Sequence, residues 1–372
     1  MQSKVSVVKC ESYKREEVEL SLRKALGFLG GISNFIKPGA RVLLKPNLLI
    51  AIEPQCGITT HPEIIRAVAG MLKEIGAKIY LGDSPSTFAK VEDIKEVYQR
   101  TGMAQLAREE NIELVEFRQK ALKNGLPLAS ILDEVDFVIN IPKFKTHDFM
   151  TLTAAVKNLF GLIPGLYKSE LHKKYFKPEE FAAKLVDIYE IARPALNIVD
   201  AIDVIEGDGP GTKGDLRHTG LILASADAVS IDSILALLTK LKPEDIPTNK
   251  EAIRRGIGNA DLGSIEIVGE KLADIIIPDF KLPQPSIARK LPPFVFNLLK
   301  KFLDYRPKIN EKLCVKCKKC QEACPTKVID IERKKKIDYR NCIRCFCCLE
   351  VCPERAISIK KSLLARLLGL RG

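Results

Sequence analysis

The sequence predicts an α/β protein with a large N-terminal domain and a small cysteine-rich domain near its C-terminal end. Three observations lead to this prediction. Short runs of aliphatic residues alternate with helix-like stretches over the first 280 residues, a proline-rich stretch follows, and eight cysteines then occur in two equally spaced runs. Alternation of strands and helices is typical of a parallel or mixed sheet flanked by helices.

The expected elements of the large domain (residues 1–280) follow from these patterns. Expected strands cover 5–8, 41–44, 78–81, 137–141, 196–199, 221–224 and 265–268, and expected helices cover 18–28, 61–75, 94–110, 179–191 and 230–241. The stretch 61–75 illustrates the reasoning. Ile64, Ile65, Val68 and Leu72 fall on one helical face, and Gly76 follows as a stop signal.

Polar residues follow several of the expected strands. In α/β sheets ligands bind beyond the carboxyl ends of the strands, so these residues are candidates for a substrate site. They are Lys45, Asn47, Thr60, His61, Lys143, Lys145, His147, Lys157, Asn158, Asp203, Gly207, Gly209 and Asp227. The glycine loop at 207–215 matches neither a P-loop nor a dinucleotide-binding fingerprint.

The lysines and the aspartates suggest different roles. Four lysines indicate a pocket for a phosphate or carboxylate group: Lys45, Lys143, Lys145 and Lys157. The aspartates can pair with these lysines or hold a metal. Helix capping and surface ion pairing remain open as the alternative. Within this set we expect Lys145 and His147 to be catalytic, since an imidazole that titrates near neutrality is a suitable proton donor.

The two cysteine runs share one spacing, Cys-x2-Cys-x2-Cys-x3-Cys-Pro, which is typical of [4Fe–4S] clusters. In each run the first three cysteines are expected to bind one cluster, and the fourth binds the other cluster. One expected set is Cys314, Cys317, Cys320 and Cys352, and the other is Cys342, Cys345, Cys348 and Cys324. Zinc and disulfides fit this spacing less well. Cys347 is an extra cysteine, interpreted as a small buried or half-buried thiol rather than a ligand. Cys10 and Cys56 are interpreted as core or surface thiols.

Charge is unevenly distributed along the 372 residues, whose formal net charge is +12. Residues 287–372 carry 22 Lys and Arg against 8 Asp and Glu, whereas the rest of the chain carries 37 against 39. A basic surface around the clusters suits an acidic redox partner protein. Nucleic acid is not an expected partner, because aromatic residues are not interleaved with the basic ones.

The regions flanking the cysteines also carry signals. A proline-rich linker is expected over 281–307, with an amphipathic stretch at 294–303, and a basic amphipathic tail over 361–372. Such stretches dock a module on its own larger domain or lie on an anionic membrane. Neither a signal peptide nor an apolar run of 18 residues is evident. We expect a cytoplasmic protein from an anaerobic cell, and peripheral contact with the inner face of the membrane stays open.

Two family resemblances add to this interpretation. Residues 306–360 resemble the two-cluster bacterial ferredoxin fold, an α+β module. Residues 1–280 resemble domain-of-unknown-function family 362, whose members often carry such a module but whose reaction the resemblance does not define. The matching motifs are Lys45-Pro46-Asn47, Thr59-Thr60-His61-Pro62-Glu63, Lys143-Phe144-Lys145-Thr146-His147, Ala155-Val156-Lys157-Asn158-Leu159-Phe160-Gly161 and Gly207-Asp208-Gly209-Pro210.

A further likeness concerns the order of three side chains. Their order is similar to that found in nickel-pincer lactate racemases. They are His147, Lys157 and then His172, which follows Pro164-Gly165. That resemblance implies a cofactor on Lys157, a metal on His172 and proton transfer by His147. A solvated imidazole in a lysine-rich stretch is the simpler interpretation of His172.

Together these features lead to one functional expectation and two alternatives. We expect two [4Fe–4S] clusters and a ferredoxin-dependent oxidoreductase, acting as a reductase on an anionic small molecule bound in the α/β domain. The first alternative is an electron-carrier subunit of a larger redox complex, with the α/β domain as a docking scaffold. The second is a redox sensor, for which no DNA-binding element is evident.

Overall fold

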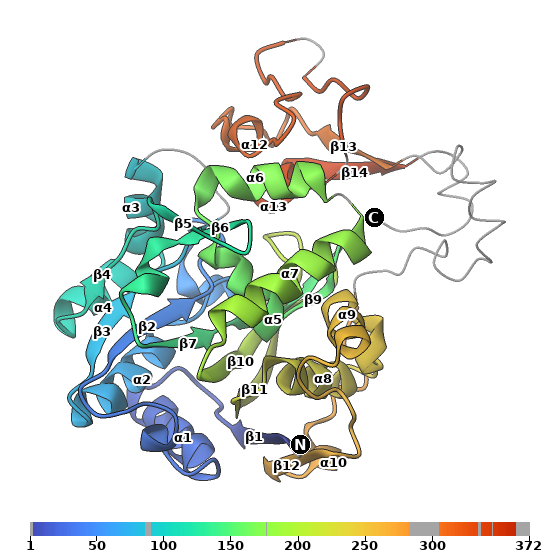
Figure 1. Cartoon of the computed structure of the whole chain (residues 1–372). Helices are drawn as coiled ribbons and strands as arrows, with labels where there is room; N and C mark the ends of the chain where they lie inside the picture. The colour runs from blue at the N-terminus through green and yellow to red at the C-terminus, as the bar shows by residue number, and fades with distance from the viewer. Residues whose placement is uncertain are drawn as a thin grey trace.

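The computed structural model describes residues 3–85, 91–175, 177–282, 305–333, 336–343 and 345–361. A mixed ten-stranded sheet runs through the large domain, in the order β12-β1-β11-β10-β7-β2-β3-β4, with β8 paired to β10 and β9 paired to β8. Figure 1 shows this sheet below the C-terminal module. The fold class expected from the sequence, an α/β domain followed by a small α+β domain, is confirmed.

The strands of the sheet pair in two directions. They are β1 (Ser3–Lys9), β2 (Arg41–Pro46), β3 (Lys78–Leu81), β4 (Glu113–Leu114), β7 (Phe137–Ile141), β8 (Lys143–His147), β9 (Thr151–Thr153), β10 (Leu196–Glu206), β11 (Asp215–Ser225) and β12 (Ile265–Gly269). The strands β10, β7, β2, β3 and β4 are parallel, so their carboxyl ends share one edge of the sheet. Strand β11 runs antiparallel to β10 and to β1.

Helices cover both faces of the sheet, and a small hairpin lies outside it. The helices are α1 (Arg15–Gly27), α2 (Pro62–Glu74), α3 (Val91–Arg100), α4 (Met103–Glu109), α5 (Ala155–Asn158), α6 (Gly165–Lys174), α7 (Pro178–Ala192), α8 (Ala228–Leu238), α9 (Pro247–Arg255) and α10 (Leu272–Ile275). The separate hairpin joins β5 (Lys120–Lys123) to β6 (Leu126–Ala129). The expected helix 94–110 is two helices, because Gly102 adopts a φ of 77° between them.

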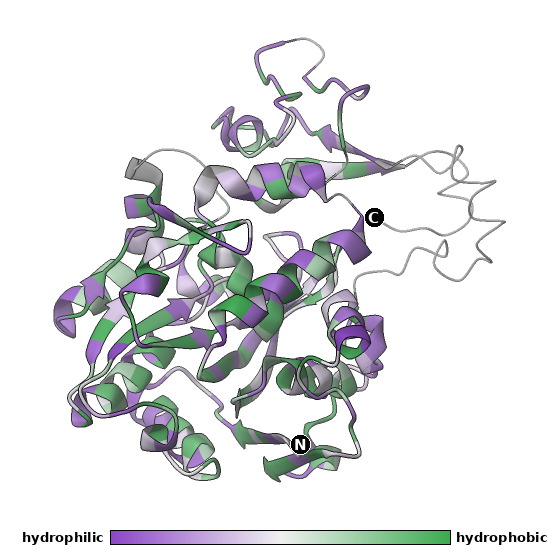
Figure 2. Ribbon diagram, in the orientation of Figure 1, coloured by the Kyte–Doolittle hydropathy of each residue, from purple (hydrophilic) through white to green (hydrophobic). Residues whose placement is uncertain are grey.

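Two apolar cores lie on the two faces of the sheet. Alternation along β2 shows how the sequence divides them: Val42 and Leu44 belong to the core under α1 and α2, whereas Leu43 belongs to the core under α5, α7 and α8. Successive strand residues point to opposite faces, so both faces need apolar side chains. In Figure 2 these central strands are mostly green.

The C-terminal module repeats one small unit. Strand β13 (Tyr305–Ile309) pairs antiparallel with β14 (Ile357–Lys361), and between them lie α12 (Lys319–Glu322) and α13 (Cys347–Glu350). Each half contains an equivalent hydrogen bond from a backbone amide to a cysteine sulfur. The amide of Val328 donates to the sulfur of Cys324 at 3.4 Å, and that of Ala356 donates to the sulfur of Cys352 at 3.2 Å. The expected amphipathic stretch 294–303 and the tail beyond residue 361 lie outside the described residues.

The module packs on the large domain through an apolar contact. Ile50, Ile58 and Ile205 belong to the same buried cluster as the interior of the module. Ile50 and Ile58 lie in the loop between β2 and α2, and Ile205 lies near the end of β10. The module is therefore placed over the carboxyl-end edge of the parallel strands, where ligands bind in such sheets.

Candidate functional site

Four cysteines of the module surround a small cavity. A space of about 20 Å³ is lined by Cys314, Cys317, Cys320 and Cys352, the first set expected from the sequence. Among the described residues no group of three His, Cys, Asp or Glu side chains converges on one ion. A cube does not require that convergence, because each cysteine binds a different iron. The donor set of four thiols around a void fits one [4Fe–4S] cluster.

The second set gathers around Cys348. Burial, and then the neighbouring sulfurs of Cys345, Cys320, Cys324 and Cys342, raise the pKa of the Cys348 thiol. Three of these neighbours, Cys345, Cys324 and Cys342, are its expected partners, and the contribution of Cys320 indicates that the two sets lie close together. Each set has two buried cysteines, and the sets differ in that Cys317 of the first is exposed whereas Cys342 and Cys345 of the second are half-buried.

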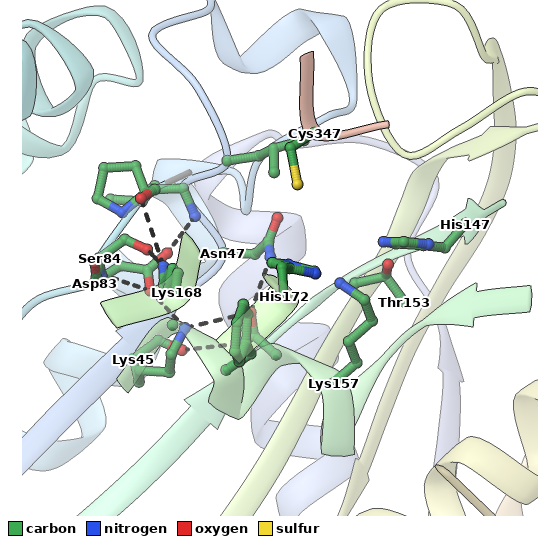
Figure 3. A pocket seen from close by; sticks show the side chains of 16 residues that line it. Lys45, Asn47, Asp83, Ser84, His147, Thr153, Lys157, Lys168, His172 and Cys347 are labelled. Atoms are coloured by element: carbon green, nitrogen blue, oxygen red, sulfur yellow. Dashed lines mark hydrogen bonds and ion pairs between the residues drawn. The ribbon is translucent and has the colours of Figure 1, made fainter. Parts of the chain in front are cut away.

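A second cavity lies between the module and the large domain. Its volume is about 70 Å³. Its lining comes from β2, the loop after β3, the segment from β8 to α6, and the module: Lys45, Asn47, Leu48, Leu49, Asp83, Ser84, Pro85, His147, Thr153, Lys157, Asn158, Phe160, Gly161, Lys168, His172 and Cys347. Figure 3 shows Lys157 and His147 at one side of this interdomain cavity and Cys347 above it.

A buried polar network forms the floor of the interdomain cavity. Lys45 Nζ donates to Asp83 Oδ1 and to the carbonyl of Pro46, both at 2.7 Å. Asn47 Nδ2 donates to Asn158 Oδ1 at 2.9 Å. Burial lowers the pKa of Lys45, and the charge of Asp83 opposes that effect. The lysine and the aspartate neutralise one another.

Gly161 permits this network to close. A methyl group at its Cα would fall on the side chains of both Asp83 and Lys45. Its carbonyl accepts a hydrogen bond from the amide of Ser84 at 3.1 Å. Only a residue without a side chain allows the chain after α5 to pass this close to the ion pair.

Lys168, on α6, is the most unusual base of the interdomain cavity. Its ammonium donates to the carbonyls of Ser84 and Pro85. Burial lowers its pKa to about 7, with Asp83 opposing and Lys45 and Lys157 adding to the decrease. A lysine with this pKa exchanges its proton near neutral pH.

The two histidines of the interdomain cavity are neutral at pH 7. The Nδ1 atom of His147 accepts hydrogen bonds from the amides of Phe149 and Met150, at 3.0 and 3.3 Å, which leaves the ring proton on Nε2. Burial, then the charges of Lys157, His172 and Lys145, lower the pKa of His147 well below its ordinary value. The titration near neutrality expected for His147 therefore does not hold, because the ring is buried among cations. Burial likewise lowers the pKa of His172 to about 3, and its ring stacks on Phe181.

Two of the expected residues support the interdomain cavity through Asn47, and a third forms a separate buried ion pair. Lys145 donates to Asn47 Oδ1 and to the carbonyl of Ile58, both at 2.7 Å. Thr60 accepts from the amide of Asn47 at 2.8 Å, so both residues hold Asn47 in place. Lys143 pairs with Asp200 at 2.9 Å, and both side chains are fully buried.

The other expected residues lie elsewhere for clear physical reasons. His61 caps α2 and stacks on Tyr13. Asp203 contacts the ring of His218 at 2.8 Å. Asp227 caps α8, at the opposite edge of the sheet, because the antiparallel β11 ends there.

The glycine loop after β10 contacts the module. The amide of Gly209 donates to Thr146 Oγ1 at 3.2 Å, Gly207 adopts a φ of 71°, and the hydroxyl of Thr212 donates to the carbonyl of Cys352 at 3.1 Å. Gly207 and Gly209 therefore shape a loop that holds the iron–sulfur module, rather than line the interdomain cavity.

Several residues of the interdomain cavity were not among the expected ligands. Asp83 and Ser84 follow a strand, and this position was a usable signal. His172 appeared only in the racemase comparison, and Lys168 lies on a polar helix that gives no signal of its own. Cys347 enters the lining only because the module docks over the strand ends.

The fold and these cysteines define an iron–sulfur protein with an α/β domain. Residues 42–236 match the family model described as Domain of unknown function (DUF362), and residues 306–353 match a 4Fe-4S dicluster domain. The chain is 36% identical over 291 residues to the thylakoid-associated protein sll1697 of Synechocystis sp., covering 76% of this chain and 89% of that protein. The chain belongs to the DUF362 family, as its motifs predicted, and carries an iron–sulfur domain, which implies electron transfer.

A solved structure also resembles part of the chain. The lactate racemase apoprotein of Thermoanaerobacterium thermosaccharolyticum aligns with a TM-score of 0.42 and 12% identity, over 65% of this chain and 58% of that one. This chain thus spans less than two thirds of the racemase. Separately, no helix in the described parts of the chain is long and apolar enough to cross a membrane.

Proposed function

We propose that this protein passes electrons between two [4Fe–4S] clusters in its C-terminal module and a small anion in the interdomain cavity, as a ferredoxin-dependent reductase. One observation carries the proposal: Cys347 lines the cavity and directly precedes Cys348, an expected cluster ligand. Consecutive Cα atoms are about 3.8 Å apart, so a ligand in the cavity is close to the buried cysteine set. When bound, such clusters supply one-electron transfer.

The charge of the lining supports an anionic ligand. Lys45, Lys157 and Lys168 line the cavity, and Asp83 is the one carboxylate among its described lining residues. Asp83 pairs with Lys45, and Lys157 and protonated Lys168 add positive charge to the lining. A low-dielectric cavity with this charge attracts anions. Its volume of about 70 Å³ corresponds to about five waters, which indicates a small ligand.

The side chains suggest a division of roles. Lys157 binds the anionic group, and the Nε2–H of His147 donates a hydrogen bond to a ligand oxygen. Lys168, whose pKa is about 7, is better suited than His147 to supply the proton that accompanies reduction. Asn47 and Asn158, which are fixed by the buried network, orient the ligand.

Native mass spectrometry of the anaerobically purified protein tests this function. The expected result is the polypeptide, two [4Fe–4S] clusters and a further small mass, with the further mass lost in Lys157→Met. The control variant Lys37→Met changes an exposed lysine outside the cavity lining, and should retain it. Retention of the ligand in Lys157→Met would refute the assignment of the site.

A second candidate is an electron-carrier subunit in which the large domain only holds the module. The apolar contact of Ile50, Ile58 and Ile205 and the Thr212–Cys352 hydrogen bond favour it. It predicts clusters without further mass, and co-purification with a larger redox enzyme.

We also propose a cytoplasmic location with peripheral contact to the inner face of a membrane. The support is the basic character of residues 287–372 and the thylakoid association in the relative's name. Co-sedimentation with anionic but not with neutral vesicles is the expected result, and equal recovery with both would refute it.

A further inference from the structure

The loop of residues 311–318 exposes apolar side chains beside the more exposed cysteine set. Leu313 is 48% exposed and Val315 is 62% exposed. They flank Cys314, and the exposed Cys317 follows two residues after Val315. Large aliphatic side chains at the surface next to a redox centre are typical of a contact with another protein.

Lysines accompany these apolar side chains. Lys312, Lys316 and Lys318 are all exposed, and in the described parts of the chain neither Lys312 nor Lys316 forms an ion pair. The acidic residue of the loop, Glu311, is paired with Lys336 at 3.0 Å. The loop therefore presents net positive charge around an apolar centre.

The two cysteine sets face different surroundings. The set with Cys317 reaches the surface at this loop, whereas Cys348 is buried beside Cys347, which lines the interdomain cavity. Cys347 of α13 lines this cavity together with Lys168 and His172 of α6. Cys317 is the one exposed cysteine of the two described sets, whereas Cys342 and Cys345 of the second set are half-buried, so the first set offers the more accessible point of entry for electrons.

We propose that loop 311–318 is the docking surface for a small acidic one-electron carrier protein. Leu313 and Val315 pack against an apolar patch beside the carrier's redox centre, and Lys312 and Lys316 face the carboxylates around it. One electron would pass from the reduced carrier to the cluster that Cys314, Cys317, Cys320 and Cys352 would hold, with no proton transferred. Opposite charges accelerate such encounters, and salt weakens them.

The docking proposal rests on the proposed function only for the direction of electron flow. It can therefore be tested separately. In anaerobic stopped-flow experiments the full-length protein is mixed with flavodoxin, an acidic carrier, in both redox directions. The expected rate of electron exchange falls about tenfold or more between roughly 0.02 M and 0.5 M salt. A rate independent of salt, or no exchange in either direction, would overturn the proposal.

Matched variants locate the surface. Lys312→Glu with Lys316→Glu should slow exchange at low salt at least about tenfold. Lys37→Glu with Lys250→Glu, which alters the net charge equally on exposed residues of the large domain, should leave the rate within about twofold. Val315→Ser should slow exchange without altering the salt dependence. Equal slowing by both charge-reversed pairs would show that only overall charge matters, and would refute the site.

Two further measurements separate possible failures. The extent of reduction by dithionite and the spectrum of the reduced clusters should be the same in every variant, which shows that the module is folded. Lys157→Met, which alters only the interdomain cavity, should leave flavodoxin exchange unchanged. Loss of ligand binding in that variant with normal exchange would support docking independently of the function of the cavity.

Discussion

Lys45 and Asp83 form an ion pair of 2.7 Å in which the lysine side chain is 0% exposed and the aspartate side chain 4% exposed. Lys45 lies in β2, and Asp83 lies just after β3, the neighbouring parallel strand. Because the two strands end at the same edge of the sheet, the two charged side chains are next to each other. The pair organises the floor of the interdomain cavity, since Asp83 Oδ2 also accepts from the amide of Leu48 at 2.7 Å.

Replacing Asp83 should be costly. Asp83→Asn leaves the Lys45 charge buried without a counter-charge, a change that typically costs about 3–5 kcal/mol of unfolding free energy. Denaturant unfolding followed by circular dichroism under anaerobic conditions measures it. Asp136→Asn is the matched control, because Asp136 pairs with Arg41 at 2.8 Å but with side chains 42% and 49% exposed, and solvent-exposed ion pairs contribute little to stability. Similar losses in the two variants would contradict this account.

The space at Gly161 gives a second prediction. Gly161→Ala places a methyl group on the Lys45–Asp83 pair, and overpacking of this kind costs about 1–3 kcal/mol. Gly165→Ala is the control, since no atom lies within contact distance of its added methyl group. Thermal unfolding should show a lower midpoint for the first variant and little change for the second. An unchanged midpoint in Gly161→Ala would mean that the chain can move away from the pair.

Much of the interdomain cavity could be predicted from the sequence because it follows strand ends. Lys45, Asn47 and His147 lie where parallel strands stop, and Lys157 and Asn158 follow on the next short helix. The same rule failed for Asp227, since β11 runs antiparallel to β10 and its carboxyl end lies at the other edge. Strand direction depends on pairing between distant segments, which local patterns do not contain.

Other parts depended on tertiary packing. Asp203 lies within β10, which continues to Glu206, rather than in a loop beyond a strand. Lys168 and Cys347 reach the cavity because α6 and the module pack over the strand ends, and neither contact leaves a periodic signal. The depressed pKa of His147 has the same origin, because it reflects burial among lysines that the order of residues does not reveal.

The buried His147 should make stability depend on pH. Its pKa in the folded protein lies well below 6.5, so below about pH 6.5 the unfolded chain binds a proton that the folded protein does not. This contribution to stability is present above that pH and is lost on acidification, by at most about 1.4 kcal/mol per pH unit. His147→Asn, whose side-chain oxygen can accept from the amides of Phe149 and Met150, should flatten the decrease.

Anaerobic unfolding at pH values between about 7 and 5, with cluster absorbance as a check on integrity, measures this effect. Part of the slope should persist in the variant, because burial also lowers the pKa of His61 to about 4 and that of His172 to about 3. The control His218→Asn removes a half-exposed ring whose pKa hydrogen bonding to Asp203 raises, so it should not flatten the slope. An identical slope in His147→Asn and the unaltered protein would show that the pKa of His147 is the same in the folded and unfolded states.

Adjacent cysteines offer the sharpest test of how the module is connected to the interdomain cavity. Cys348→Ser removes an expected ligand and should lower the iron content by about four atoms per chain. Cys347→Ser should retain all the iron, because Cys347 points into the cavity (Figure 3). It should nevertheless alter ligand binding, or the reduction potential of the nearer cluster, since a hydroxyl replaces a thiol at the boundary between them. Iron loss in Cys347→Ser with full iron in Cys348→Ser would mean that the two cysteines exchange roles. The path from cluster to cavity would then pass through the cluster-binding cysteine itself.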